Sequence, residues 1–216
     1  MLNIILGNKN LILLKRTSIK NINETLEKNY NWKILDIGCG YRAHKNASVI
    51  ADVQNFSKLY KEKKFVQIKG KNLPFKDKEF DFVIASHVIE HVEDFEFFIK
   101  ELERISSKGY IELPSRLEDN LVFENKADHI WWFIYDDINN KLLASKRNQI
   151  IEPFITVSIA KLFEKIFRES LVMELAWEEK IDYEIDNSIQ ENNIEKTSFL
   201  KILRKYLSKK IRIFYR

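Results

Sequence analysis

The sequence predicts an α/β fold, a mainly parallel sheet with helices on both faces. Short apolar runs alternate along the chain with segments whose apolar residues repeat at helical spacing, which is typical of such sheets. One run, Phe80–Ser86, is apolar without interruption and rich in β-branched and aromatic residues, which indicates a central strand covered on both faces. With 216 residues, the chain is long enough for one domain with an appendage.

The first half of the chain supplies most strands of this sheet. An amphipathic helix is expected over Thr17–Asn29, where apolar residues recur at helical spacing. A second helix is expected over Asp94–Ile105 for the same reason, with Asp94 as its cap. The runs expected to form strands are Lys33–Ile37, Val49–Asp52, Phe65–Ile68, Phe80–Ser86 and Tyr110–Leu113.

The second half of the chain has a different character. Two apolar runs around a polar turn, His129–Tyr135 and Lys141–Ser145, predict a hairpin at the edge of the sheet. A helix is expected over Val157–Phe167, and a pair of strands within Leu171–Ile185. We expect these elements to cover the substrate side of the molecule.

A basic tail ends the chain. From Thr197 to Arg216 there are seven basic residues and no acid, so the first 196 residues carry 29 basic and 32 acidic side chains. This negative body gives no electrostatic support to nucleic-acid binding, and no nucleic-acid partner is expected. The tail predicts a basic amphipathic helix, Phe199–Phe214, which either packs on the domain or lies on an anionic membrane surface.

These features suggest a domain division and a compartment. We predict a domain over 1–185, with its core at 32–115 and a hairpin and substrate cover at 116–185, then a polar linker and basic helix over 186–216. The single cysteine excludes an internal disulfide framework, and no apolar run approaches the length of a membrane span. The sequence therefore predicts a cytoplasmic protein, peripheral to the membrane if the tail binds lipid.

The stretch Lys33–Asp52 carries the clearest functional pattern. An apolar run containing Asp36 breaks into Gly38-Cys39-Gly40, and a second apolar run ends in Asp52. Glycines let a ligand approach the main chain, and a carboxylate at a strand end can accept both hydroxyl hydrogens of a ribose. We expect both carboxylates to converge on one nucleoside-sized cleft.

Further motifs follow in a recognisable order. Leu73-Pro74-Phe75 precedes the strand Phe80–Ser86, and Glu90-His91-Val92 follows it. Together with the glycine turn, these motifs resemble the class I S-adenosylmethionine-dependent methyltransferases, and most closely their small bacterial type 11-like branch. The resemblance covers roughly Trp32 to Ser115.

The resemblance implies a Rossmann-like class I methyltransferase fold: a seven-stranded, mainly parallel sheet with an antiparallel edge hairpin and C-terminal helical additions. It implies S-adenosyl-L-methionine as cofactor and methyl transfer as activity. The residues that it assigns to the cofactor are Asp36, Gly38, Gly40, Asp52, Val53, Asn72, Leu73, Ser86 and His87.

Three departures from the family pattern affect particular positions. Gly38 and Asp52 are only fourteen positions apart, where about twenty are expected, so the first crossover helix should be shortened. Arg42 and Ala43 stand where a third glycine is usual. Lys69 stands where an acid often binds the adenine amino group, so recognition of adenine would rest on backbone groups around 70–73.

The residues that would contact the methyl acceptor are less clearly indicated by the sequence. His87, His91 and His129 are candidates for a neutral imidazole that removes a proton from the acceptor, although methyl transfer does not require a dedicated base. His87-x-x-Glu90-His91 also matches a zinc-peptidase pattern, but no downstream helix supplies a third ligand, and no metal is expected. A small-molecule, saccharide or lipid-linked acceptor is expected.

Two other functions stay open. Gly38-x-Gly40-x-x-Ala43 satisfies a loose dinucleotide fingerprint, so a nicotinamide-dependent oxidoreductase is one alternative. A methyltransferase-like scaffold that binds a partner without catalysis is the other, because Lys69 and the short crossover would both weaken a cofactor site.

Overall fold

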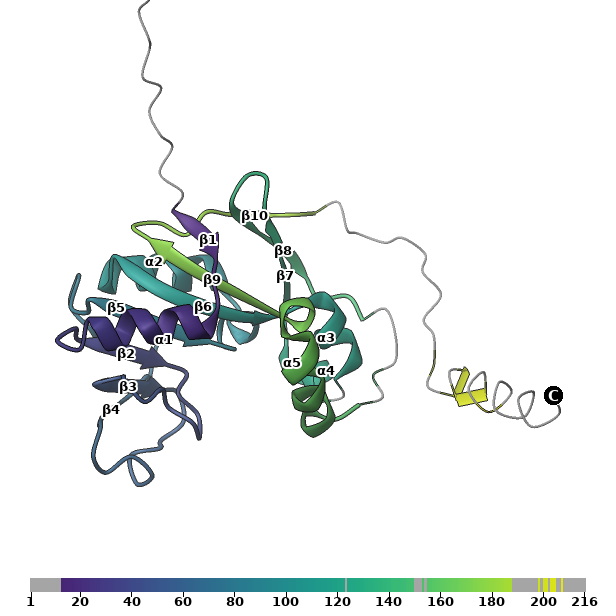
Figure 1. Ribbon diagram of the computed structural model, residues 1–216, viewed down its shortest axis with the longest axis horizontal. Helices are drawn as coiled ribbons and strands as arrows, with labels where there is room; N and C mark the ends of the chain where they lie inside the picture. The colour runs from purple at the N-terminus through teal and green to yellow at the C-terminus, as the bar shows by residue number, and fades with distance from the viewer. Residues whose placement is uncertain are drawn as a thin grey trace, which may run out of the picture.

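A main sheet of seven strands and a second sheet of three organise the protein (Figure 1). The structure is a computed structural model that describes residues 13–122, 124–149, 153, 155–187, 198, 200, 201, 203, 204 and 207. The strands of the main sheet, in spatial order, are β1 (Leu14–Arg16), β9 (Val172–Glu178), β6 (Lys108–Pro114), β5 (Phe82–Ser86), β2 (Ile34–Ile37), β3 (Val49–Asp52) and β4 (Lys64–Gln67). Those of the second sheet are β10 (Tyr183–Ile185), β8 (Lys141–Lys146) and β7 (Trp131–Asp136).

The main sheet is parallel except at one edge. β2 pairs in parallel with β3 and β5, β3 with β4, and β5 with β6. β9 runs antiparallel to β6, and β1 runs antiparallel to β9. The predicted α/β class and the seven-stranded, mainly parallel sheet are therefore confirmed.

Helices cover both faces of the main sheet. Helix α1 (Ile19–Lys28) buries Ile22 and Leu26 in a cluster with one set of strand side chains, and α2 (Phe95–Ile105) packs into a second cluster with the alternate set. Asp94 caps α2 as predicted, since its side chain accepts a hydrogen bond from the Phe97 amide at 3.2 Å. A short 3-10 helix, η1 (Ile89–His91), precedes α2.

The crossovers on the β2–β3–β4 side contain no helix. The described residues between β2 and β3 form turns, as the short spacing from Gly38 to Asp52 predicted, and β4 also follows β3 without a helix. The remaining helices, α3 (Arg116–Leu121), α4 (Asn125–Asp128) and α5 (Val157–Leu171), gather beside the other end of the main sheet (Figure 1). The β4 edge of the main sheet therefore lacks crossover helices, whereas three helices gather beside the opposite part of the sheet.

The predicted hairpin forms, but not at the edge of the main sheet. β7 and β8 pair antiparallel and take β10 as a third strand in the second sheet. The physical reason is packing: the Phe95 ring lies 4.6 Å from the Trp131 ring and 5.6 Å from the Phe133 ring, so β7 lays its apolar face on α2. The antiparallel edge of the main sheet comes from β9 and β1 instead.

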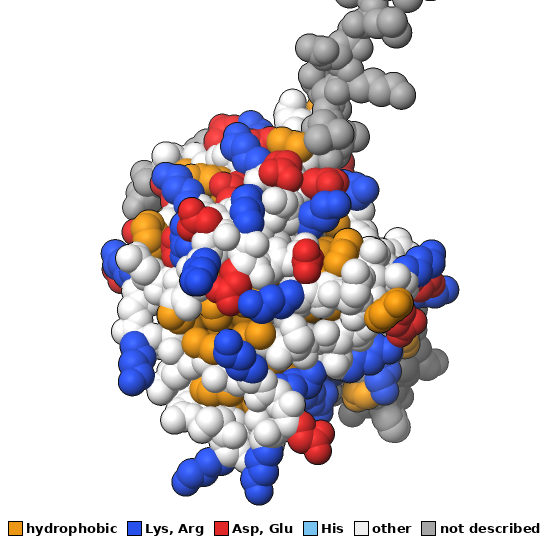
Figure 2. Space-filling model, turned by 90° about the vertical axis from the view of Figure 1, so that its left-hand side faces the viewer, with side chains coloured by type: hydrophobic (Ala, Val, Ile, Leu, Met, Phe, Trp, Pro, Cys, Tyr) orange, Lys and Arg blue, Asp and Glu red, His pale blue; other side chains and the backbone are white. Residues whose placement is uncertain are grey.

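The surface carries mixed charge. On the face shown in Figure 2, acidic and basic side chains lie among each other, with hydrophobic side chains exposed between them.

None of the helices within the described ranges is long and apolar enough to cross a membrane. Within the predicted tail helix, residues 200, 201, 203, 204 and 207 are helical, and its other residues lie outside those described. The domain division, the absence of a nucleic-acid partner and the membrane contact stay predictions.

Candidate active site

The turn after β2 depends on two glycines. Gly38 and Gly40 have positive φ angles of 72° and 48°, a region that residues with a side chain rarely adopt. A Cβ atom at Gly38 would lie 2.3 Å from Val88 Cγ2, so the turn passes directly against the segment after β5. At Gly40, no atom of the described residues lies within 4 Å of the corresponding position. One side of the turn is therefore accessible to a ligand.

Asp52, the last residue of β3, holds this turn in place. Its Oδ2 accepts a hydrogen bond from the Gly40 amide at 3.0 Å, and its Oδ1 accepts one from the Gln54 amide at 2.8 Å. Each oxygen keeps a second lone pair for a ligand hydroxyl. Asp52 lines a cavity of about 200 Å³ with mostly apolar walls, which we name the apolar cavity. Its lining includes Gly38, Asp52, Val53, Gly70, Leu73 and Val88.

Asp36 lies on the other side of the turn. It lines a second cavity of about 200 Å³, the carboxylate cavity, together with Gly38, Ser86 and Glu112. Burial raises the pKa of Asp36 to about 6, although its Oδ2 accepts a hydrogen bond from the His44 amide at 2.7 Å. The expectation of one shared cleft was therefore wrong: Asp36 and Asp52 line two cavities that meet at Gly38.

Leu73 closes the apolar cavity because α2 fixes the loop that carries it. The Leu73 amide donates a hydrogen bond to Glu101 at 2.7 Å, and Arg104 donates to the Leu73 carbonyl at 3.1 Å and the Phe75 carbonyl at 2.8 Å. Asn72, which the family pattern assigned to the cofactor, is exposed and lines neither cavity. Its assignment receives no support from the geometry.

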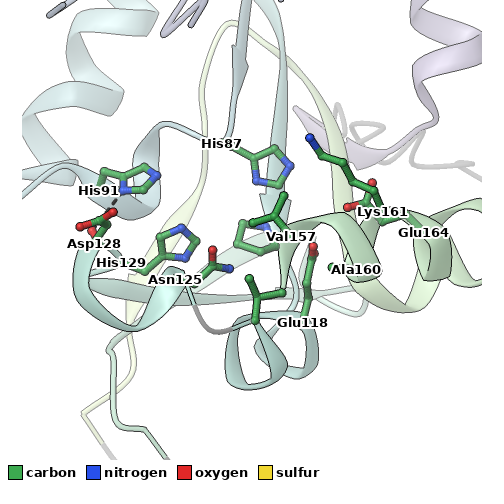
Figure 3. A pocket seen from close by; sticks show the side chains of 12 residues that line it. His87, His91, Glu118, Asn125, Asp128, His129, Val157, Ala160, Lys161 and Glu164 are labelled. Atoms are coloured by element: carbon green, nitrogen blue, oxygen red, sulfur yellow. Dashed lines mark hydrogen bonds between the residues drawn. The ribbon is translucent and has the colours of Figure 1, made fainter. Parts of the chain in front are cut away.

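His87, His91 and His129 meet in a third cavity of about 280 Å³, the histidine cavity (Figure 3). They come from three separate segments: the turn after β5, the helix η1 and the loop before β7. Side chains from α3 and α5 form a further part of the wall, namely Glu118, Lys161 and Glu164. The structure thus brings together the three histidines that the sequence singled out.

His87 joins the carboxylate cavity to the histidine cavity. Its Nε2 lies 3.2 Å from Glu112 Oε1, and its Nδ1 lies 3.3 Å from Glu90 Oε1. Burial by itself lowers the pKa of His87, but the hydrogen bonds with Glu112 and Glu90 outweigh it and raise this pKa to about 10. The imidazole is therefore a cation near neutral pH, which argues against the neutral base that we expected at His87.

Glu118 and Glu112 are two site residues that the sequence analysis missed. Both are buried. Burial raises the pKa of Glu118 to about 7, helped by the nearby Glu164 and opposed by His87. Glu112 differs, because His87 lowers its pKa to about 2 against the effect of burial. An acid inside the apolar run Tyr110–Leu113 was a signal that could have identified Glu112, whereas the stretch around Glu118 has no such pattern.

Comparison with known families gives a match to one part of the chain. A family described as "Methyltransferase domain" matches residues 35–111, which contain the glycine turn, Asp52, the Leu73 loop and His87. Residues 35–111 therefore resemble a methyltransferase domain, and the match covers about a third of the chain.

Several proteins are similar to this methyltransferase domain. MJ1123, an uncharacterized protein of Methanocaldococcus jannaschii, is 32% identical over 81 residues, which are 35% of this chain, and the match spans 40% of that relative's length. PH0226 of Pyrococcus horikoshii is 18% identical, with a TM-score of 0.41 over 74% of this chain and 90% of that one. A SAM-dependent methyltransferase of Thermotoga maritima is 15% identical, with a TM-score of 0.44 over 75% of this chain and 97% of that one.

S-adenosyl-L-methionine is the cofactor of such a methyltransferase domain, and the residues present fit it. The apolar cavity offers walls for a nucleobase, and Asp52 at its edge keeps lone pairs for ribose hydroxyls. The carboxylate cavity beyond Gly38 offers Asp36 and Glu112 to a positively charged amino group. Lys69 is exposed, while Gly70 lines the apolar cavity. The roles of individual residues, Gly40 and Ser86 included, stay predictions.

Proposed function

We propose that the protein transfers a methyl group from S-adenosyl-L-methionine to a small polar molecule in the histidine cavity. The observation that carries this proposal is the contact between His87 and Glu112, whose Nε2 and Oε1 atoms are 3.2 Å apart. Glu112 lines the carboxylate cavity and His87 lines the histidine cavity, so the two cavities adjoin. A cofactor bound across Gly38 and an acceptor in the histidine cavity would therefore be neighbours.

The chain's own residues supply binding and proton transfer. The bound cofactor supplies a methyl group on a positively charged sulfur, which needs little chemical activation. Positioning of the acceptor and exclusion of water are then the protein's main contributions. We assign Glu118 as the base, because a buried carboxyl with a pKa of about 7 can take a proton from an amine or hydroxyl near neutral pH.

The size and lining of the histidine cavity support a small, polar acceptor. Its volume of about 280 Å³ is just below the range for small-molecule sites, about 300–1,000 Å³. Imidazole, carboxylate and amide side chains line part of it, and the buried Glu118 Oε2 has no partner among the described residues, so a polar group of the acceptor would find a matching contact there. A small amine, a small alcohol or one sugar unit, free or linked to a lipid, has the matching chemistry.

The dinucleotide alternative receives no support from the turn. Pyrophosphate recognition uses the N-terminus of a helix directly after the glycine turn, and the described residues 38–48 contain no helix. A catalytically inactive scaffold would have the same fold but would not transfer a methyl group. Measurements of cofactor binding and of methyl transfer therefore distinguish it from our proposal.

Calorimetry with adenosylhomocysteine and transfer of labelled methyl groups to a panel of small amines and alcohols test the proposal. We expect Asp52→Ala to weaken adenosylhomocysteine binding, and Glu118→Gln to keep that binding while turnover falls about 100-fold. Glu62→Gln, the same replacement at an exposed position, is the matched control. A chain that does not bind adenosylhomocysteine would instead favour the scaffold.

A further inference from the structure

We propose that Glu90, His91 and His129 bind a divalent transition-metal ion on the wall of the histidine cavity. One ligand atom from each of these side chains can be chosen so that all three lie within 4.8 Å of one another. Glu90 and His91 are neighbours in η1, and His129, which precedes β7, lies 38 positions after His91 in the chain. The fold therefore supplies the third ligand that the sequence pattern lacked.

The backbone holds the three residues together independently of any ion. The Ile130 amide donates a hydrogen bond to the Glu90 carbonyl at 2.8 Å, which ties the segment of His129 to η1. The rings of His91 and His129 lie edge to face, with their centroids 4.5 Å apart (Figure 3). This fixed arrangement is what a metal site needs, because ordering the ligands then costs little on binding.

Both imidazoles direct the same nitrogen toward a ligand. His91 Nδ1 lies 3.1 Å from the Asp128 carbonyl, and His129 Nδ1 lies 2.5 Å from Asp119 Oδ1. An acceptor beside Nδ1 favours the tautomer with its proton on that atom, which leaves the lone pair on Nε2; at His129 the carboxylate is close to Nδ1 but is not aligned as a hydrogen bond. Histidine ligands in metal sites are usually held in this way, by a carboxylate or a carbonyl behind the ring.

Glu90 supplies the independent observation. Its side chain is 0% exposed, and its Oε1 is 3.3 Å from His87 Nδ1. Its Oε2 is buried and has no hydrogen-bond partner among the residues that the structure describes. A buried carboxylate oxygen without a partner is costly, and a cation beside it would remove that cost.

The ligand set indicates which kind of ion would bind. Two imidazole nitrogens and one carboxylate oxygen suit first-row divalent ions such as Zn²⁺, Fe²⁺ and Co²⁺ better than Mg²⁺ or Ca²⁺. Three protein ligands leave further coordination positions for a hydroxyl or amine of the acceptor, as in catalytic metal sites. The ion would then orient the acceptor and lower its pKa, a role that rests on the proposed methyl transfer, while the binding itself does not.

Titration of the metal-free full-length protein with Co²⁺ tests the site through its visible absorption spectrum and by calorimetry. We expect one Co²⁺ per chain in the wild type, and at least about 100-fold weaker binding in His91→Ala, His129→Ala and Glu90→Gln. Asp119→Asn, behind the His129 ring, should weaken binding by about 10–100-fold. The matched control is His44→Ala, whose ring contacts Asn23 at 2.9 Å in another part of the protein.

His91 is exposed, so His91→Ala decides the outcome even if a substitution of the buried Glu90 or of His129 prevents folding. The proposal is overturned if the wild type takes up no stoichiometric Co²⁺, or if His91→Ala binds it as tightly as the wild type. Adenosylhomocysteine binding, measured in parallel, separates the two proposals. Binding of adenosylhomocysteine without Co²⁺ overturns the metal site alone, and binding of Co²⁺ without adenosylhomocysteine supports the metal site while the methyltransferase function fails.

Discussion

Replacing Gly38 by alanine tests two separate reasons for a glycine at this position. The first is conformational, because a residue with a Cβ atom pays about 1–2 kcal/mol to adopt the left-handed region where Gly38 lies. The second is steric, because the new methyl group would lie 2.3 Å from Val88 Cγ2, and overpacking costs about 1–3 kcal/mol. We therefore expect Gly38→Ala to lower the free energy of unfolding by about 2–5 kcal/mol.

Gly40→Ala is the matched control for this prediction. Gly40 shares the positive φ but has no atom of the described residues within 4 Å of the added Cβ position, so only the conformational cost of about 1–2 kcal/mol applies. Urea denaturation of both variants, at constant m-value, measures the difference between them.

Val88→Ala provides the second arm of the test. In the Gly38→Ala background it removes the atom that the new methyl group meets, so the double variant should be more stable than the sum of the two single effects predicts, by about 1–3 kcal/mol. Equal losses of stability at Gly38 and Gly40, together with simple additivity in the double variant, would refute the close contact.

Three further predictions concern stability. Because folding raises the pKa of Asp36 from 3.8 to about 6, the free energy of unfolding should fall by about 3 kcal/mol as the pH rises between these values. Asp36→Asn should remove this contribution, so the fall that urea denaturation measures between pH 4 and pH 7 should be about 3 kcal/mol smaller than in the wild type; buried Glu118, whose pKa is also raised, contributes a fall of the same sign in both proteins. Gly109→Ala should cost about 1–3 kcal/mol, since its Cβ would lie 2.3 Å from Trp177 Nε1; an unchanged denaturation midpoint would contradict this contact. Arg168→Met should cost about 2 kcal/mol in the same assay, because it removes the ion pairs of Arg168 with two buried carboxylates, Glu112 at 2.6 Å and Glu174 at 3.1 Å; Glu112 keeps its contact with His87, and the guanidinium is partly exposed, so the loss stays below that of a fully buried pair.

The glycine turn and the position of Asp52 at the end of β3 could be predicted from the sequence because their signals are local. The glycines at 38 and 40 follow an apolar run directly, and Asp52 closes the next one, so each side chain is placed by the strand that carries it. Periodicity also identified α1, α2 and α5 with ends within a few residues; the predicted helix ended at Phe167, where the backbone of α5 is non-helical (φ −120°, ψ 29°) before a last turn that reaches Leu171.

The acceptor side could not be predicted in the same way because its contacts are distant in the chain. Periodicity indicates that Trp131 and Phe133 are buried, but it does not identify the element against which they pack. In the structure they pack on α2, and their strand does not pair with the main sheet. The same packing brings His129 to Glu90 and His91. The raised pKa of His87 also depends on Glu112, which belongs to a different strand.

The separation of the second sheet from the main one has a consequence for how selectivity can change. Residues 34–112 supply most of the lining of the apolar and carboxylate cavities, where we propose that the adenosyl group binds, whereas α3, α4 and α5 supply most of the lining of the histidine cavity proposed for the acceptor. Substitutions in the latter can reshape which molecule is accepted while leaving the glycine bend and its carboxylate anchor untouched. A library confined to the lining positions of α3 and α5 is therefore the natural starting point for changing the acceptor of the proposed reaction.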